Sequence, residues 1–337
     1  MSQPLFDDIV ERLAEYFDVT ATHDVTTWTP ERIATALQEA DGALVTLNER
    51  IGMAEVANAG RLRAIANVGV GYNNLDIPAL TARNIVATNT PDVLTDTTAD
   101  MAFTLLMAAA RRVTEAERWL REGQWTQWSF DTLLGVDVHG STLGILGMGR
   151  IGQGIAQRGA HGFGMRVLYH NRSRLPESIE SNCRAGYVDF DTLLQQADHL
   201  VLVVPYSPAT HHVIDAAALA KMKSTATLIN IGRGGLVDED ALATALAAGK
   251  LFSAGLDVFE SEPAINPKLL ALRNVVLTPH VGSASLSTRR AMATLAVDNL
   301  IAALGHGPRA GNPPTAINAA DIIGMGAKGT KTIAPKR

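Results

Sequence analysis

Two patterns of apolar residues alternate along the first third of the chain. Four apolar residues recur at helical spacing and predict a helix over residues 6–17: Ile9, Leu13, Tyr16 and Phe17. Short continuous apolar runs predict buried strands at residues 17–20, 42–46, 62–67 and 85–89. Periodic stretches predict helices over residues 30–39 and 52–59. Such alternation is typical of a parallel sheet with helices on both faces.

A second alternating unit begins at residue 143. Its apolar runs predict strands at residues 143–146, 166–169, 187, 200–204, 227–230, 254–257 and 275–277. A helical stretch over residues 283–304 then returns the chain to the first unit. The sequence therefore predicts an α/β protein with two doubly wound parallel-sheet domains, one inserted into the other.

The predicted domain borders follow from this order. Residues 1–95 and 286–320 are expected to form a discontinuous outer domain, and residues 96–285 the inserted domain. A cleft between two such domains is a common place for ligands, so we expect a cofactor and a substrate to meet there. Residues 321–337, which follow several chain-breaking Gly and Pro residues, are expected to form a disordered tail.

One long helix is predicted over residues 97–122. Thr95 or Asp96 can cap its start, and arginines follow towards its end at Arg111, Arg112, Arg118 and Arg121. Its first half is largely apolar, which is typical of a helix buried between domains or subunits.

Composition narrows the class of protein. The chain has 337 residues, of which 47% are hydrophobic and 19% charged, with a formal net charge of −5. This mild acidity argues against nucleic acid as the main partner. The apolar stretch 101–110 is too short to span a bilayer, and the N-terminus lacks the features of a signal peptide. A single cysteine, Cys183, indicates a reducing compartment, so we expect a cytoplasmic protein with no metal site.

A glycine motif follows the apolar run at 143–146. Gly147, Gly149 and Gly152 have the spacing G-x-G-x-x-G, directly between a predicted strand and a predicted helix. The first glycine permits a tight turn, the second lets the backbone approach a pyrophosphate, and the third allows close helix packing. Since a helix N-terminus also attracts phosphate, this stretch predicts a dinucleotide site.

The residues after the next predicted strand bear on the choice of nucleotide. About 20 residues after the glycine motif, an acidic residue would hold the ribose 2′-OH of NADH. Here the sequence has Asn171, Arg172, Ser173 and Arg174. Two arginines beside a hydroxyl suit a 2′-phosphate, so NADPH is favoured, with NADH possible. The alternative is a solvated basic loop without a ligand.

Reactive side chains follow three further predicted strands. Arg233 lies between glycines, Glu260 and Glu262 follow Asp257, and His280 follows Thr278-Pro279. Ligands bind at the carboxyl ends of parallel strands, so these groups can share one crevice. An arginine suits a substrate carboxylate, and a histidine beside a carboxylate can donate a proton. Taken singly, each of these residues could equally be structural or exposed.

Together these stretches resemble the D-2-hydroxyacid dehydrogenase family, and within it the glyoxylate/hydroxypyruvate reductase and 2-ketogluconate reductase group. The matching segments are 68–76, 90–100, the glycine motif, 230–237, 255–263 and 278–284. The resemblance implies a Rossmann nucleotide-binding domain inserted into a flavodoxin-like substrate domain. Members usually begin with a strand, whereas only residues 1–5 precede the first predicted helix here. We therefore expect a missing first strand or a truncated start.

The resemblance also implies the roles of individual residues. Arg233, Glu262 and His280 match the catalytic residues, so Glu260 is not the acid. The substrate contacts match Val70, Gly71, Arg233, His280, Gly282 and Ser283. The cofactor contacts match Thr98, Gly147, Met148, Gly149, Arg150, Ile151, Gly152, Asn171, Arg172, Ser173, Arg174, Pro205, Thr210, Ile231 and Asp257.

The implied activity is NADPH-dependent reduction of small 2-oxo acids, such as glyoxylate and hydroxypyruvate, to D-2-hydroxy acids. A 2-ketogluconate reductase or another enzyme of the family is the first alternative. A nucleotide-binding interaction protein similar to a corepressor is the second. The resemblance further implies a homodimer through residues 97–130, in which Trp125 or Trp128 reaches the partner's active site or both only pack the dimer.

Overall fold

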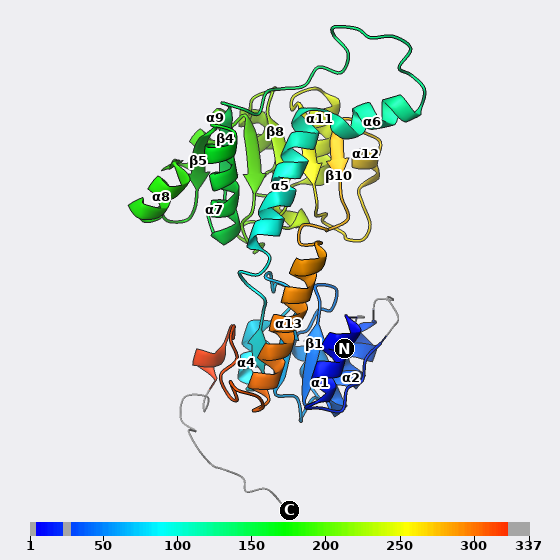
Figure 1. Ribbon diagram of the computed structural model, residues 1–337, viewed down its shortest axis with the longest axis vertical. Coiled ribbons are helices and arrows are strands. Elements are labelled where there is room, and N and C mark those ends of the chain that lie inside the picture. The colour runs from blue at the N-terminus through cyan, green and yellow to red at the C-terminus, as the bar shows by residue number, and fades with distance from the viewer. Residues whose placement is uncertain (1–4, 23–27, 323–337) are drawn as a thin grey trace, which may run out of the picture. The chain divides into compact units, whose positions relative to one another are not determined.

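The computed structural model describes residues 5–22 and 28–322, which form two compact units. Unit 1 comprises the chain up to Leu94 and from Ser285 onwards, and unit 2 extends from Thr95 to Ala284. The predicted tail therefore falls almost entirely outside the described residues. Figure 1 shows the elements of both units, and each unit is described separately below.

Unit 1 contains a three-stranded parallel sheet in the order β1-β2-β3. Its elements are α1 (Asp7–Ala14), α2 (Pro30–Glu39), β1 (Gly42–Val45), α3 (Met53–Val56), β2 (Ala64–Asn67), α4 (Ile77–Ala82), β3 (Val86–Thr88), α13 (Leu286–Ala303) and a short 3₁₀ turn (Ala319–Asp321). Thr29 and Asp76 cap α2 and α4 through their side chains, and each helix has a proline in its first turn. The C-terminal segment pairs antiparallel with β3 at Thr88 and Ala316.

The predicted strand at residues 17–20 is not formed. Phe17 and Val19 pack instead against the apolar cluster that α1 and α13 build on one face of the sheet. The ring of Phe17 also meets His306 edge-on. Their apolar character therefore reflects packing beside helices, which periodicity alone cannot distinguish from a short buried strand.

Unit 2 contains a seven-stranded parallel sheet in the order β10-β9-β8-β7-β4-β5-β6. Its strands are β4 (Thr142–Leu146), β5 (Arg166–His170), β6 (Ala185–Tyr187), β7 (His199–Leu202), β8 (Thr227–Asn230), β9 (Ser253–Leu256) and β10 (Val275–Leu277). Its helices are α5 (Thr95–Ala110), α6 (Val113–Arg121), α7 (Arg150–Gln157), α8 (Glu177–Cys183), α9 (Phe190–Gln196), α10 (Ala216–Lys221), α11 (Glu239–Ala247) and α12 (Pro267–Leu270). The strand order reverses between β4 and β7, where ligands bind in sheets of this type.

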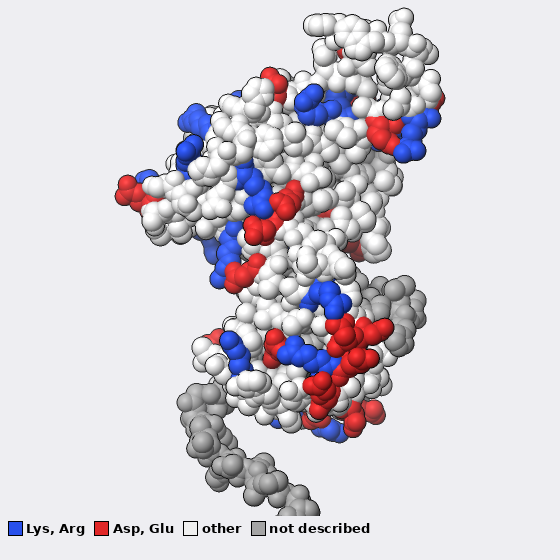
Figure 2. Space-filling view, in the orientation of Figure 1, with Lys and Arg blue, Asp and Glu red and all other residues white. Residues whose placement is uncertain are grey.

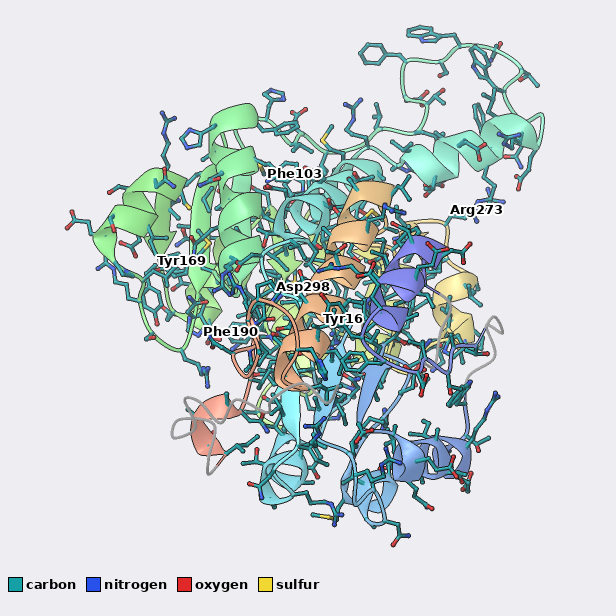
Figure 3. The ribbon with its side chains drawn as sticks, turned by 60° about the horizontal axis from the view of Figure 1, so that its bottom comes forward. Tyr16, Phe103, Tyr169, Phe190, Arg273 and Asp298 are labelled. Atoms are coloured by element: carbon teal, nitrogen blue, oxygen red, sulfur yellow. The ribbon has the colours of Figure 1, made fainter. Side chains whose placement is uncertain are left out.

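Helices cover both faces of this sheet. Helices α5 and α7 build one apolar core with the strands, and α9, α10 and α11 build the core on the opposite face. Phe103 of α5 stacks on Phe163 at the edge of the first core (Figure 3). The two predicted doubly wound sheets are thus confirmed. The strands that carry the candidate site pack against an apolar core on each face of the sheet.

The single predicted helix over residues 97–122 is wrong, because the chain forms α5 and α6 with a break between them. Arg112 has a left-handed backbone with φ of 53° and ends the first helix. Its guanidinium pairs with Glu115, and the Ala110 carbonyl accepts a hydrogen bond from Val136 N–H. The bond from Val136 replaces the helical bond that the Ala110 carbonyl would accept in a continuous helix.

Helix α6 and the loop after it, residues 113–135, form an arm with little packing, which Figure 1 shows extending from the sheet. No residue of α6 is buried. Large apolar side chains along the arm are exposed: Leu120, Trp125, Trp128, Phe130 and Leu134. Within the described part of the chain, no helix combines the length and apolar character needed to cross a membrane.

Candidate active site

The predicted nucleotide site begins where β4 turns into α7. Gly147 has φ of 105°, and a Cβ there would lie 2.8 Å from Val204 N. A Cβ at Gly152 would lie 2.2 Å from the Gly147 carbonyl oxygen, so helix and turn are in backbone contact. Gly149 forms the N-cap of α7, and no atom lies within 4 Å of the position of its missing Cβ. The turn is thus tightly packed at Gly147 and Gly152 and has open space at Gly149, an arrangement that suits a pyrophosphate.

The loop after β5 is tied to this turn. Met148 N–H donates to Asn171 Oδ1 at 2.7 Å, so this amide is already engaged and Asn171 supports the glycine turn. Arg172 and Ser173 are exposed. Among the described residues, no ion pair or hydrogen bond involves the Arg172 side chain, which leaves its guanidinium available.

Arg174 has a different environment from Arg172. Its guanidinium forms a bidentate pair with the carboxylate of Glu180 in α8, at 2.9 and 2.7 Å. Glu180 also accepts from the hydroxyl of Tyr169, the residue labelled in Figure 3, and this hydroxyl accepts from Leu175 N–H. The hydrogen bonds from Arg174 and Tyr169 lower the pKa of Glu180, so the carboxylate is charged. Arg174 therefore holds the loop against α8.

Other predicted cofactor residues line the strand ends. The Thr210 hydroxyl accepts from Ser207 N–H and donates to the Pro205 carbonyl, which closes the loop after β7. Ile231, directly after β8, and Thr98, in the first turns of α5, are both buried. The Thr210 side chain therefore bonds within its own loop, and those of Ile231 and Thr98 pack inside the protein.

Arg233 follows β8 in a loop that its neighbours fix. Asn230 accepts from Gly232 N–H and donates to the Arg233 carbonyl, so its side chain spans the turn. A Cβ at Gly234 would lie 1.8 Å from the Phe259 carbonyl carbon, so the arginine loop rests on the backbone before Glu262. Partial burial lowers the pKa of Arg233, and the charge of the nearby Glu262 opposes this change. The guanidinium stays protonated in both cases, because its pKa in water is so high.

Glu262 and His280 form the central pair of unit 2. His280 Nδ1 donates to Glu262 Oε2 at 2.8 Å, and Phe259 N–H donates to the other carboxylate oxygen at 2.8 Å. Burial alone would raise the pKa of Glu262. The His280 hydrogen bond and charge, the Phe259 amide and the Arg233 charge outweigh it and lower the pKa. Glu262 is therefore ionised and can stabilise a protonated imidazole.

Asp257 shapes the loop that presents His280. Its buried carboxylate accepts from the Thr278 hydroxyl at 2.6 Å, from Val281 N–H at 2.9 Å and from Gly282 N–H at 2.7 Å. His280 itself has φ of 53°, a left-handed conformation that is costly for a residue other than glycine. The predicted contact residues Asp257 and Gly282 thus bind each other, and Ser283 follows half-exposed.

Glu260 points to a different partner from Glu262. Its carboxylate accepts from His212 Nε2 at 2.8 Å, while its N–H donates to Glu239 Oε1 at 2.8 Å. Sequence reasoning missed Glu239, Asn230 and His212 as supports of the site. For Glu239 one signal was present, because it opens a helix directly after the segment that carries Arg233.

Val70 and Gly71 lie in unit 1, in the turn after β2. Asn89 Nδ2 donates to the Val70 carbonyl at 2.8 Å, and Asn67 Nδ2 donates to the Gly71 carbonyl at 2.9 Å. Within the described residues, the N–H groups of Val70 and Gly71 make no hydrogen bond to the protein. Two adjacent free N–H groups can hold an anion such as a carboxylate.

The arrangement in unit 2 combines three chemical capacities. A glycine turn suits a dinucleotide, a half-buried arginine suits an anion, and an ionised carboxylate orients a histidine that can deliver a proton. No metal is needed for any of these. They are the components of hydride transfer to a carbonyl with protonation of its oxygen.

Comparisons with known proteins agree with this chemistry. Residues 103–282 match the family described as D-isomer specific 2-hydroxyacid dehydrogenase, NAD binding domain. The chain is 48% identical to the glyoxylate/hydroxypyruvate reductase B of Klebsiella pneumoniae (strain 342) over 299 residues, which cover 88% of this chain and 92% of that protein. It is 46% identical over 313 residues to the glyoxylate reductase of Pyrococcus horikoshii, with 92% of each chain covered.

A solved structure extends the match to three dimensions. The NADPH-dependent glyoxylate/hydroxypyruvate reductase of Sinorhizobium meliloti, in complex with NADP and malonate, superposes with a TM-score of 0.83 and 35% identity. The superposition covers 95% of this chain and 96% of that one. The resemblance noted from the sequence is thus confirmed: the chain belongs to the D-isomer specific 2-hydroxyacid dehydrogenase family of NAD(P)-dependent oxidoreductases.

Proposed function

We propose that the protein reduces small 2-oxo acids, chiefly glyoxylate and hydroxypyruvate, to D-2-hydroxy acids with NADPH. The observation that carries the proposal is the 2.8 Å pair between His280 and Glu262 beside the half-buried Arg233. Both relatives match most of this chain, and by their names the Klebsiella protein acts on glyoxylate and hydroxypyruvate and the Pyrococcus protein on glyoxylate.

The proposed mechanism assigns one task to each group. Arg233 and the N–H groups of Val70 and Gly71 bind the substrate carboxylate, and Arg233 also polarises the keto oxygen. NADPH, when bound, supplies the hydride that the keto carbon accepts. His280 donates the proton from Nε2 to the forming alkoxide, because its Nδ1 faces Glu262. One hydride and one proton thus convert the carbonyl into an alcohol.

The preference for NADPH is assigned mainly to Arg172. Both arginines of the loop were expected to hold the 2′-phosphate. Arg174, however, is paired with Glu180, whereas Arg172 is exposed at the same loop. The Sinorhizobium relative, whose structure holds NADP, supports the same choice of nucleotide.

A substrate panel tests the proposal directly. The purified protein is mixed with NADPH and, in turn, glyoxylate, hydroxypyruvate, pyruvate and 2-ketogluconate, and NADPH oxidation is followed by absorbance. We expect the largest kcat/KM with glyoxylate or hydroxypyruvate. Oxidation of NADPH with 2-ketogluconate alone would favour the alternative of a 2-ketogluconate reductase. Absence of oxidation with every 2-oxo acid would contradict the proposal and favour the nucleotide-binding interaction protein.

We further propose that the arm pairs with a second copy of this chain as a homodimer. Phe130 is 86% exposed and Trp128 75%, and their rings meet edge-on. In Figure 2 the surface of the arm beyond α6 is largely white, that is, uncharged. An apolar surface of this kind is typical of an obligate contact between copies.

Sedimentation measures the proposed association. Phe130→Ser should shift the protein from dimer towards monomer, because it removes the most exposed apolar side chain of the arm. Leu270→Ser is the matched control, since Leu270 is also exposed, at 55%, but lies in α12 outside the arm. A wild-type protein that sediments as a monomer would refute the dimer.

A further inference from the structure

In the turn after β2 in unit 1, three consecutive carbonyl groups accept hydrogen bonds, those of Gly69, Val70 and Gly71. The Gly69 carbonyl accepts from Thr90 N–H at 3.0 Å. The next carbonyl, of Val70, accepts from the side chain of Asn89 at 2.8 Å, and that of Gly71 accepts from Asn67 at 2.9 Å. Two of these donors, Asn89 and Thr90, are neighbours that follow β3.

The planarity of the peptide fixes where the N–H groups of the turn point. In a trans peptide the carbonyl and the following N–H lie on opposite sides. When Thr90 and Asn89 hold the Gly69 and Val70 carbonyls, the N–H groups of Val70 and Gly71 must face away from the end of β3. Both N–H groups then face the same side and form a concavity for an anion.

We propose that Asn89 is a positioning residue for the substrate carboxylate, because its amide holds the Val70–Gly71 peptide in the orientation that presents Gly71 N–H to the anion. The inference rests on the proposed function, in which this turn binds the carboxylate. In this inference Asn89 acts on the substrate through the peptide, because its Nδ2 is engaged with the Val70 carbonyl.

The backbone of Asn89 is held by residues near the C-terminal end of unit 1. Its backbone carbonyl accepts from the Thr315 hydroxyl and, at 3.3 Å, from the side chain of the fully buried Asn299. Its N–H donates to the Thr315 carbonyl. The backbone of Asn89 therefore joins β3 to the C-terminal segment, while its side chain alone reaches the turn. Removal of the side chain leaves the structural bonds in place.

A carboxamide is the group that this position requires. It donates a hydrogen bond and carries no charge, so it orients the peptide without attracting or repelling the anion. An aspartate of the same size would place an acceptor against the Val70 carbonyl and a negative charge beside the substrate carboxylate. The change Asn89→Asp should therefore be more harmful than Asn89→Ala.

The test is a split between substrate and cofactor constants in the full-length protein. For Asn89→Ala we expect KM for glyoxylate to rise about 5- to 15-fold, as for the loss of one hydrogen bond. The kcat and the KM for NADPH should change less than about 3-fold. Asn318→Ala is the matched control, because Asn318 is buried and bonds Ala87 N–H at 2.8 Å but does not touch the turn. It should lower Tm and leave KM unchanged.

Each outcome decides the inference. An unchanged KM in Asn89→Ala, or equal effects of Asn89→Ala and Asn318→Ala, would overturn it. If the wild type does not reduce glyoxylate, the proposed function fails. Oxamate binding to the NADPH-loaded protein, measured by calorimetry, then replaces KM. Weaker binding to Asn89→Ala than to wild type supports the positioning role, and equal or absent binding overturns it.

Discussion

Replacing Glu262 by glutamine should slow the reaction. The substitution keeps the size of the side chain but removes its charge, and an amide can accept at only one of the two positions where the carboxylate accepts. The Glu262 carboxylate stabilises the positive charge of the imidazole that donates to the alkoxide. Without it, kcat/KM at neutral pH should fall.

The size of the effect follows from the geometry. The Nδ1–Oε2 distance of 2.8 Å places the two charge centres about 4 Å apart, which corresponds to about 4 kcal/mol at an effective dielectric constant of about 20. The side chains of His280 and Glu262 are 30% and 35% exposed, so solvent screening reduces this to about 2 kcal/mol. Loss of this interaction from the transition state should lower kcat/KM by about 30-fold.

Two features of the site bear on this effect. The pKa of Glu262 lies below its usual range, because the partners of the carboxylate outweigh its burial. The carboxylate therefore keeps its charge throughout the neutral range, and its effect on the rate is lost only in acid, as the pH falls through this lowered pKa. The half-buried Arg233 guanidinium also loses its anionic neighbour in Glu262→Gln.

The assay is kcat/KM for glyoxylate from acid to alkaline pH, with saturating NADPH. Glu260→Gln is the control, because Glu260 lies on the same loop but faces His212. The control should keep the wild-type kcat/KM at neutral pH and the wild-type loss of activity in acid. If kcat/KM of Glu262→Gln equals that of wild type at every pH, the assignment of Glu262 as the charge partner of His280 is refuted.

Two further substitutions test the nucleotide site. Arg172→Ala should raise KM for NADPH by about tenfold or more, as for the loss of a charge-assisted hydrogen bond, and leave KM for NADH unchanged. Arg174→Ala should change KM for NADPH and KM for NADH to a similar extent, because Arg174 holds Glu180. A larger rise in KM for NADPH in Arg174→Ala than in Arg172→Ala would contradict this interpretation. Gly152→Ala should lower stability by about 2 kcal/mol or more in thermal unfolding, because its Cβ would overlap the turn. Gly162→Ala, with no atom within 4 Å of the added Cβ, should be neutral, and equal Tm values for the two would count against the close backbone contact.

The sequence was most informative for the buried strands of unit 2. The strands β8 and β10 have the predicted bounds, because a parallel strand in a sheet with helices on both faces forms a short apolar run that ends with the strand. The positions of Arg233 and His280 after these strands followed from the same runs. Family resemblance then distinguished Glu262 from Glu260, which local chemistry could not do.

Features that depend on distant contacts were not predictable. Nothing near Arg112 breaks a helix in sequence, and the break depends on Val136, which follows the arm. The pairing of Arg174 with Glu180 spans a turn whose conformation the sequence does not specify. Asn89 meets Thr315 only in the folded unit, so its role could not be inferred from either segment alone.

The junction between Asn89 and Thr315 has a consequence for biosynthesis. More than 200 residues separate these partners, and a ribosome adds them in about 10–40 s. During this interval the inserted unit emerges whole and can fold, while the edge of β3 stays uncovered and Asn89 lacks its anchor. A nascent chain released before residue 315 would thus carry a complete dinucleotide fold and an exposed strand edge, a combination that invites aggregation or chaperone binding.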